Sequence, residues 1–342
     1  MTVKLCTPVD EPAWDAYVDA NPHALGYHRI AWRRIIDQVF GHATPYLMAE
    51  SNGRVTGVLP AARLKSPLFG DFLVSLPFVN YGGACADDDG VVRELMGALA
   101  ELGRELGVDH VEVRTETATD YGLRARSAKV SMRKPLPATA EALSKSFPAK
   151  LRSQIKRAQQ EAMTVRIGRE DQLDAFYDVF SINMRDLGTP VYSRRLFAAV
   201  LEHLPDTSWI CTVWLGEKPV AAGFLVGFRD MIEIPWASSL RQYNRLSPNM
   251  LLYWSVLSFA VERGYQVFDF GRSSPESGTY KFKAQWGAQP VPLYWHYWVR
   301  GEGALPELNP QNPKYQLAVR VWQQLPLGLT RLIGPSIVMH LP

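Results

Sequence analysis

Apolar and polar positions in the first half of the chain follow the pattern of a hairpin, a strand, a helix and a further strand. The segment Ser51–Val55 has the composition of a turn between strands. Farther along, apolar residues recur at alternating spacings of three and four, which predicts a helix that ends at Gly107. The predicted strands are Thr56–Leu64, Phe72–Val79 and Val108–Arg114, and the helix contains Val92, Leu95, Leu99, Leu102 and Leu106.

The second half of the chain repeats this order. The turn Gly216–Pro219 separates two predicted strands, and Gly264 follows a predicted helix. The elements are expected at Trp209–Leu215, Val220–Phe228, Met231–Ala237, Asn249–Arg263 and Tyr265–Phe270. Because roughly 40–50 residues separate hairpin and glycine in both halves, the pattern indicates a duplicated α/β domain and not a short solenoid repeat. An accidental α/β match is the alternative.

The repeated pattern divides the chain into two domains and a tail. The segment Leu136–Thr139 is typical of a linker, and a glycine-rich, proline-containing run ends the second pattern. We therefore predict domains at residues 1–138 and 139–305, followed by a tail at residues 306–342.

The tail combines a short predicted helix, Lys314–Gln324, with an apolar stretch, Leu325–Pro342. Pro326 and Pro335 interrupt this stretch, so no long helix is expected there. We expect the tail to pack on the domains of the chain itself, with shallow contact to a membrane surface as the alternative.

Composition changes this prediction little. The 342 residues are 47% apolar and 21% charged, an ordinary globular balance, and the net charge of +3 permits an anionic ligand without requiring DNA. Cys6, Cys85 and Cys211 lie far apart and show no metal-ligand spacing, so we expect no metal site and a reducing cytoplasm. No signal peptide or membrane-spanning run is visible.

The densest polar cluster follows the predicted strand that ends at Phe270. In open α/β sheets, ligands bind beyond the carboxyl ends of strands, and glycine, serine and proline form a loop there. Positive charges and aromatic rings alternate in the cluster, so an extended backbone would place Lys281 and Lys283 on one face. The candidate side chains are Asp269, Arg272, Ser273, Tyr280, Lys281, Phe282, Lys283 and Trp286. A solvated basic turn is the alternative.

Four other features could carry chemistry. Arg152 and Lys156 lie four residues apart on a predicted helix, and an anionic ligand would relieve their repulsion. Glu233 interrupts an apolar strand, where a buried carboxylate can serve as a base. Arg185 lies near a loop after a helix, and Tyr81 precedes glycines that let a ligand approach the backbone. A solvated helix face, an ion pair and a simple turn are the alternatives.

These residues together resemble the FemAB family. The resemblance rests on Leu151-Arg152-Ser153-Gln154-Ile155-Lys156-Arg157-Ala158, Arg185–Tyr192, Glu233–Ser239, Phe268–Ser274 and Gly278–Gly287. More narrowly, the sequence is similar to FemAB-related proteins associated with XrtA/PEP-CTERM exosortase and exopolysaccharide systems. The likeness is densest from about Lys145 to Val299 and implies two tandem GNAT-like α/β domains with mixed sheets.

The resemblance also implies roles for individual residues. Phe282-Lys283 matches a Phe-Lys pair near the acyl carbon in the family's aminoacyl ligases, so Lys283 is the expected transition-state stabiliser. Arg185 matches an arginine that holds precursor phosphates, and Gly82-Gly83 stands where the family has a Gly-Pro turn. The long helical arm of tRNA-binding members is missing, and Arg245–Met250 lacks the glycines that hold the pyrophosphate of acetyl-CoA. The donor therefore stays open between aminoacyl-tRNA and acyl-CoA.

We interpret the chain as a transferase that attaches an acyl or aminoacyl group to a sugar- or peptide-containing envelope precursor. It would need no permanently bound cofactor, and it would act in the cytoplasm, at the inner membrane face if the tail contacts lipid. The predicted catalytic residues are Lys283, Glu233 and Tyr280, and the predicted substrate-binding residues are Arg152, Lys156, Arg185, Tyr81, Trp236, Asp269, Arg272, Ser273 and Phe282. A CoA-dependent N-acetyltransferase and a non-catalytic scaffold or carbohydrate-binding protein of an export machinery are the rival interpretations.

Overall fold

A computed structural model describes residues 1–301, 303, 305 and 313–341 of the chain. The chain forms two compact units. Unit 1 comprises Met1–Lys129 with the described residues of Pro292–Leu308 and Met339–Pro342, and unit 2 comprises Val130–Val291 with those of Asn309–Val338. The division after Lys129 falls nine residues before the predicted domain boundary at residue 138. The predicted tail boundary at residue 306 lies outside the described residues. The three predicted segments stay a prediction.

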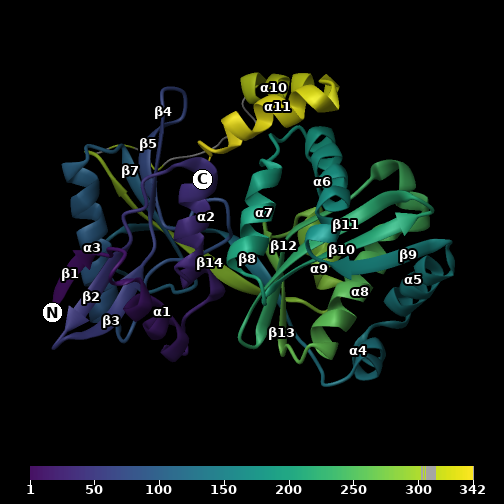
Figure 1. The fold of residues 1–342 in the computed structure, drawn as a ribbon, viewed down its shortest axis with the longest axis horizontal. Helices are drawn as coiled ribbons and strands as arrows, with labels where there is room; N and C mark the ends of the chain where they lie inside the picture. The colour runs from purple at the N-terminus through teal and green to yellow at the C-terminus, as the bar shows by residue number, and fades with distance from the viewer. Residues whose placement is uncertain (302, 304, 306–312, 342) are drawn as a thin grey trace. The chain divides into compact units, whose positions relative to one another are not determined.

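Unit 1 is built around short strands and helices (Figure 1). Its first strands form an antiparallel sheet in the order β1-β2-β3-β6, while β4 pairs with β5, β5 runs parallel to β7, and β7 pairs with β14. The elements are β1 (Thr2–Leu5), α1 (Glu11–Ala20), η1 (Gly26–His28), α2 (Ala31–Phe40), β2 (Leu47–Ser51), β3 (Arg54–Leu59), β4 (Ala62–Ser66), β5 (Gly70–Val74), β6 (Cys85–Ala86), α3 (Asp89–Glu105) and β7 (His110–Thr115). Strands β8 (Arg124–Pro135) and β14 (Gln289–Val299) each contain residues of both units.

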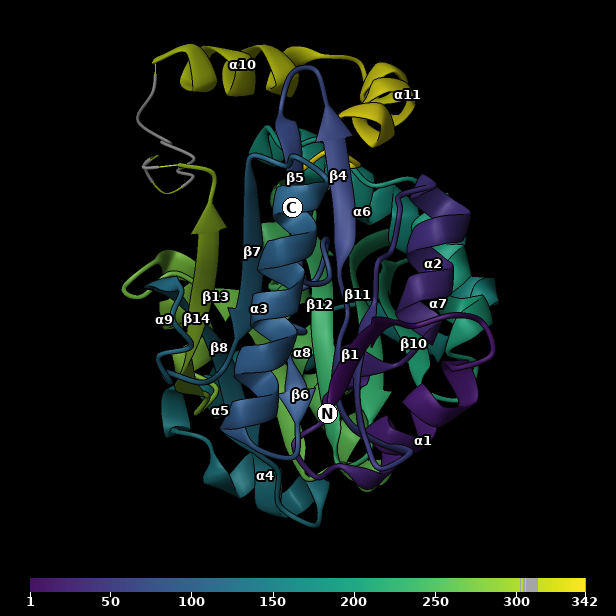
Figure 2. The same cartoon turned by 90° about the vertical axis from the view of Figure 1, so that its left-hand side faces the viewer.

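The predicted helix of unit 1 is α3, which lies against β7 (Figure 2). Val92, Leu95 and Leu99 of the predicted stripe are buried, whereas Leu106 lies just after the helix and is 37% exposed. The Asp88 side chain accepts the Val91 N–H at the start of α3, and Gly107 adopts a left-handed conformation after its end. The predicted strand Thr56–Leu64 is wrong in one respect, because it is interrupted between β3 and β4 at Pro60, which has no N–H to donate.

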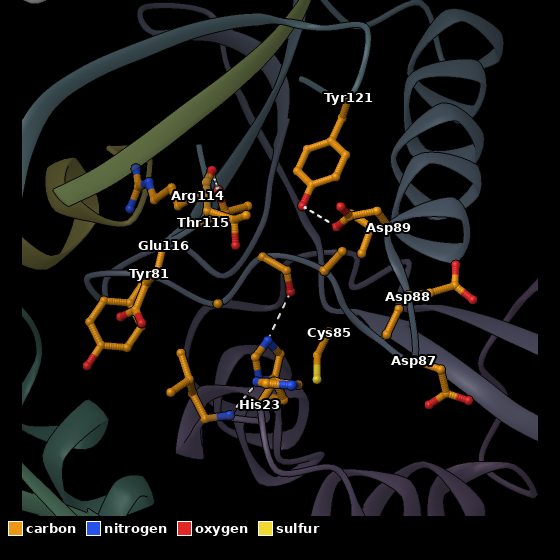
Figure 3. Close-up of a pocket in the computed structure, with 18 of the residues that line it drawn as sticks. His23, Tyr81, Cys85, Asp87, Asp88, Asp89, Arg114, Thr115, Glu116 and Tyr121 are labelled. Carbon is orange, nitrogen blue, oxygen red and sulfur yellow. Dashed lines mark hydrogen bonds between the residues drawn. The ribbon is translucent and has the colours of Figure 1, made fainter. Parts of the chain in front are cut away.

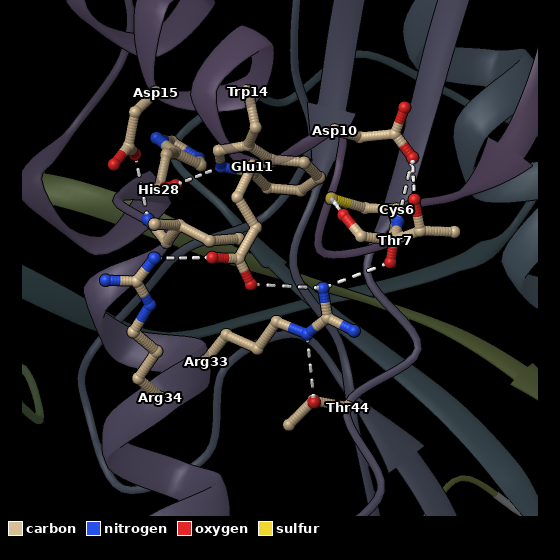
Figure 4. A network of polar contacts seen from close by, with 11 residues as sticks. Cys6, Thr7, Asp10, Glu11, Trp14, Asp15, His28, Arg33, Arg34 and Thr44 are labelled. Atoms are coloured by element: carbon tan, nitrogen blue, oxygen red, sulfur yellow. Dashed lines mark hydrogen bonds and ion pairs between the residues drawn. The ribbon is translucent and has the colours of Figure 1, made fainter.

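A polar network fixes the start of unit 1 (Figure 4). Arg33 of α2 donates to the carbonyl of Cys6 at 3.0 Å and lies 3.7 Å from Glu11 of α1, which also pairs with Arg34. The indole of Trp14 donates to the carbonyl of His28 at 2.6 Å. The indole of Trp32 in α2 donates to the carbonyl of Gly26 at 3.1 Å, so η1 is attached to both helices and the segment that lines the pocket described below is held in place.

Unit 2 contains a mixed sheet in the order β8-β13-β12-β11-β10-β9. All neighbouring strands pair antiparallel except β12 and β13, which are parallel. The elements are α4 (Ala140–Ser146), α5 (Ala149–Gln160), β9 (Met163–Gly168), η2 (Glu170–Gln172), α6 (Leu173–Leu187), α7 (Arg194–His203), β10 (Ser208–Leu215), β11 (Lys218–Phe228), β12 (Met231–Ser239), η3 (Arg241–Leu246), α8 (Pro248–Glu262), β13 (Val267–Ser273), α9 (Gly278–Ala284), α10 (Pro313–Gln324) and α11 (Leu327–Val338).

Helices cover both faces of this sheet. Successive residues of a strand point to opposite faces. On β11, Leu225 joins the core around α8, while Phe224 packs against Phe176 and Phe197 of α6 and α7. Helix α8 has many buried apolar residues because it lies in this core, as its almost continuous apolar sequence predicts.

The tail helices pack on α6 in unit 2, as expected for the tail. Helix α10 matches the predicted helix, and Pro326 separates it from α11. The prediction that Pro335 also breaks a helix is wrong, because Pro335 lies inside α11. No helix in the described part of the chain is long and apolar enough to cross a bilayer.

Candidate functional site

The parallel strands of unit 2 pair over a short distance only. Strands β12 and β13 are in register from Met231 opposite Val267 to Glu233 opposite Asp269, and both continue beyond that point. Here β12 is also irregular against β11, with a register shift between Phe224 and Val226. A parallel ladder that ends while its strands continue leaves backbone groups without ladder partners, at the sheet edge where α/β proteins bind ligands.

Asp269 organises the end of this ladder. The side chain is fully buried and accepts hydrogen bonds from Ser131 Oγ at 2.6 Å, Arg133 Nε at 2.9 Å and Gly271 N at 2.7 Å. Between Asp269 and Arg272 the register against β8 shifts, and Gly271 has φ +75°. Asp269 therefore stabilises a bulge, and its predicted contact with substrate stays a prediction.

Lys283 contacts the backbone of this bulge. Its side chain is buried, and Nζ donates to the carbonyls of Gly271 and Arg272, both at 2.9 Å. Burial lowers the pKa of Lys283 to about 8, although the carboxylates of Asp269 and Glu233 oppose this shift. An ammonium has three N–H donors, so these two carbonyls leave one donor for a ligand.

The segment that carries Lys283 is a helix, so the prediction that it is a loop is wrong. Helix α9 begins after Ser277, whose hydroxyl accepts the Tyr280 N–H at 3.2 Å. In a helix, Tyr280 and Lys283 are one turn apart and lie on the same side. Phe282 instead packs against Tyr253, with ring centroids 5.0 Å apart. The missed signal is Ser277, a preferred N-cap residue.

Three further predicted residues lie close to this bulge, either next to it in the chain or opposite it on the neighbouring strand. Glu233 is buried on β12 directly opposite Asp269. Arg272 is half-buried, and Ser273 is buried with a hydroxyl that has no hydrogen-bond partner in the described structure. A buried hydroxyl without a partner is uncommon in folded proteins, and it is the kind of group that a ligand can satisfy.

The other predicted residues of unit 2 lie in different surroundings. Arg152 and Lys156 are exposed on α5, opposite the buried stripe that contains Leu151. Arg185 is half-buried and paired with Asp186 at 2.8 Å. Trp236 is buried and packs edge-on against Phe197 at 5.2 Å, in the core below α6 and α7. The structure does not join these residues to Lys283 through any contact in the described chain.

Unit 1 contains a pocket of about 490 Å³, shown in Figure 3. Its lining comes from the segment before η1, from residues 81–89 around β6, and from the end of β7 and its following loop. Tyr81, predicted to bind substrate, lines it and packs edge-on against Tyr27 at 5.2 Å. His28 accepts from Leu25 N at 2.8 Å and contacts the Gly83 carbonyl at 3.0 Å, and burial lowers its pKa to about 4.

The pocket is polar and rich in carboxylates. Asp88 caps α3, Asp89 accepts from Tyr121 at 3.3 Å, and Asp87 accepts from Tyr17 at 2.9 Å. A side chain at Gly83 would meet the Arg114 carbonyl at 2.6 Å. The glycine at this position is therefore required by the neighbouring strand, and not only by an approaching ligand. The sequence pattern predicted Tyr81 and the glycines as part of a ligand site, but it did not predict the carboxylates of this pocket.

The fold is that of tandem GNAT proteins. FemX is similar at 14% identity and TM-score 0.66, over 93% of this chain and 100% of that one. A tandem GNAT protein from the clavulanic acid pathway is similar at 11% identity and TM-score 0.58, over 89% and 99% of the two chains. The C-terminal domain of a protein named as a lysylphosphatidylglycerol synthetase from Agrobacterium fabrum is similar at 15% identity and TM-score 0.58, over 84% and 91%.

The similarity in sequence covers a shorter part of the chain than the similarity in structure does. Residues 145–284 match the acetyltransferase (GNAT) domain, and this stretch includes β12, β13 and Lys283. No protein of curated function matches the chain in sequence. The predicted fold class of two GNAT-like α/β domains with C-terminal helices is confirmed. Among the described residues, no group of His, Cys, Asp and Glu side chains is arranged to hold a metal ion.

Proposed function

We propose that this chain is an acyl- or aminoacyl-transferase whose reacting centre lies at the end of the β12–β13 ladder. The observation that carries the proposal is the buried ammonium of Lys283, which is bonded to two backbone carbonyls and, among the described residues, to no carboxylate. With a pKa of about 8, this group is mostly protonated at neutral pH. A fixed positive group in a low-dielectric site stabilises an oxyanion far more than it would in water.

The proposed reaction is attack of an acceptor amine on the carbonyl carbon of the donor. As the C–N bond forms, negative charge develops on the carbonyl oxygen, and the third N–H of Lys283 would donate to it. The amine loses a proton to Glu233, the proposed base. Collapse breaks the C–O bond of an aminoacyl ester or the C–S bond of a thioester, and that proton passes to the leaving group. Tyr280, one turn before Lys283, would position the donor.

The donor class is either aminoacyl-tRNA or acyl-CoA. The FemAB resemblance supports the first. The GNAT domain match supports the second, and a similar tandem GNAT structure has a printed name that specifies a form without AcCoA. Helix α8 begins at Pro248 after Ser247, which has φ +55° and makes no side-chain cap bond. The start of α8 therefore has no side-chain cap, and the N-terminus of a helix can bind a pyrophosphate such as that of acetyl-CoA. An acetyl-CoA-dependent N-acetyltransferase is for this reason the second candidate function.

The acceptor is a sugar- or peptide-containing precursor of the envelope or of an exopolysaccharide, in a PEP-CTERM/exosortase-associated system. The FemAB-related resemblance supports this class, and the printed name of one similar structure refers to a lysylphosphatidylglycerol synthetase. The polar pocket of unit 1 has the volume of a small-molecule site and would bind one segment of the acceptor. Arg152, Lys156 and Arg185 are the proposed phosphate contacts.

The test is an incubation of the full chain with labelled acyl-CoAs and aminoacyl-tRNAs, each with amine-bearing envelope precursors. Transfer from aminoacyl-tRNA supports the first donor, whereas transfer from acetyl-CoA together with calorimetric binding of acetyl-CoA supports the second. Because Lys281 is exposed on the same helix, Lys281→Met is the matched control for Lys283→Met. Full activity in Lys283→Met would remove Lys283 from the mechanism, and no transfer from any donor would favour a scaffold.

A further inference from the structure

The tail helices α10 and α11 are buried on one side only. A side chain at Gly188, just after α6, would collide with Val319 of α10, and one at Gly334 of α11 would collide with the backbone of Val191. Trp322 on α10 is buried as well. This inner side therefore fits closely against α6 and the segment that follows it.

The other side of the two helices exposes apolar side chains. Leu317 and Val321 are 63% and 55% exposed, and Leu329 and Leu332 are 39% and 74% exposed. The first two are four residues apart on α10 and the last two are three apart on α11, so each pair shares one side of its helix. These side chains make up four of the ten large exposed apolar residues in the described part of the chain. Their concentration within one short stretch indicates a binding surface.

The charge of the tail is also distinctive. The tail, residues 306–342, contains Lys314, Arg320 and Arg331 and one acidic residue, Glu307, whereas the rest of the chain has 34 basic and 33 acidic residues. The tail therefore carries +2 of the net charge of +3. Arg320 is exposed beside Val321, and Arg331, which pairs with Asp178 at 2.7 Å, is adjacent to Leu332.

We infer that the exposed side of α10 and α11 docks on an anionic lipid surface. Short helices with exposed leucines and basic residues lie in the headgroup region, and each basic residue near an anionic surface adds to the attraction. A second copy of the chain is a poorer occupant, because a two-fold interface would bring the positive tails together. The inference is independent of the proposed transferase activity and would stand if no transfer were found.

The test is cosedimentation of the full chain with phosphatidylglycerol/phosphatidylcholine vesicles and with pure phosphatidylcholine vesicles. Binding is expected on the anionic vesicles only. Leu317→Gln combined with Leu332→Gln should weaken it about tenfold, because both residues lose their apolar contact. Arg320→Gln should weaken it about fivefold. Leu68→Gln is the matched control, since Leu68 is 81% exposed and lies outside the tail.

Three outcomes would overturn the inference. One is equal binding to neutral and anionic vesicles, which would remove the argument from charge. Another is unchanged binding in the double leucine variant. The third is no vesicle binding together with a dimer, measured by light scattering, that the leucine variant dissociates, since a second copy would then cover this surface.

Discussion

The two units share one structural feature but use it differently. In unit 1, β5 and β7 are parallel over three registered pairs that end at Val74 opposite Glu112. In unit 2, β12 and β13 are parallel over three registered pairs that end at Glu233 opposite Asp269. In both units, the last pair therefore places a buried carboxylate on the second strand.

The difference is the cation at each ladder end. In unit 1, Arg114 follows two residues after Glu112 and donates to it at 2.7 Å, while its guanidinium lies 5.1 Å from the ring of Trp295. In unit 2, Arg133 pairs with Asp269, and a second cation, Lys283, comes from a separate helix. Unit 1 thus balances its carboxylate with a permanently charged group, whereas unit 2 has an additional group that can titrate.

The largest expected effect tests the structural role of the cation in unit 1. Arg114→Met would leave Glu112 buried without its ion-pair partner, since both side chains are almost inaccessible. We expect a loss of about 3–5 kcal/mol in the free energy of unfolding, measured by urea denaturation. Lys65→Met is the control within unit 1, because Lys65 is 71% exposed and its pair with Asp71 should contribute little. Equal stability of the two variants would show that Arg114 has no structural role.

The second prediction concerns the cation of unit 2. Lys283→Met keeps the length and the apolar stem but removes the charge, so turnover should fall by roughly 10²–10³-fold. The rate is measured at matched protein concentration, with Lys281→Met expected to lose much less. If both lysine variants lose the same activity, the buried position of Lys283 has no catalytic meaning, and the contrast between the units is structural only.

The pH dependence should separate the units further. Since burial lowers the folded-state pKa of Lys283 from 10.5 to about 8, the rate should fall up to tenfold per pH unit above about pH 8. Stability should change in the opposite direction. Between pH 8 and 10.5 the unfolded chain binds more protons at this lysine than the folded chain does, so the free energy of unfolding rises, by up to roughly 3 kcal/mol.

Lys283→Met is the control for both curves. The variant should lack this contribution to the stability rise. A wild-type stability curve that matches the variant curve between pH 8 and 10.5 would mean that Lys283 titrates near its ordinary value.

Much of the fold was predictable from periodicity. Helix α3 follows from an apolar stripe and α8 from an almost continuous apolar run, while the hairpins and the glycines after both helices follow from local turn and cap residues. The predicted strand Phe72–Val79 ends early, at Val74, because Leu76 and Phe78 have positive φ values that no local signal indicates for these residue types.

The candidate site was predictable only in part. Lys283 was identified through a family resemblance, but the bonds of Asp269 to Ser131 and Arg133 join residues more than 130 positions apart in the chain. Such contacts depend on which strands become neighbours, here β8 and β13, and the hydrophobic pattern does not specify this. The same reason applies to the pocket of unit 1, where Asp89 and Tyr121 meet only after folding.

The smallest effect on stability is expected at an exposed cation, which sets a reference for the two buried ones. Arg152 lies on the outer side of α5 and no ion pair involves it in the described chain. Arg152→Glu should change the free energy of unfolding by less than about 0.5 kcal/mol, because isolated surface charges contribute little. If Arg152 binds acceptor phosphates, the Michaelis constant for a phosphorylated acceptor should rise several-fold at low salt, and the difference from wild type should shrink near 1 M salt. Arg157→Glu, an exposed change on the same helix, is the control. Equal kinetic effects of the two variants would indicate general electrostatic attraction and would exclude a specific phosphate contact at Arg152.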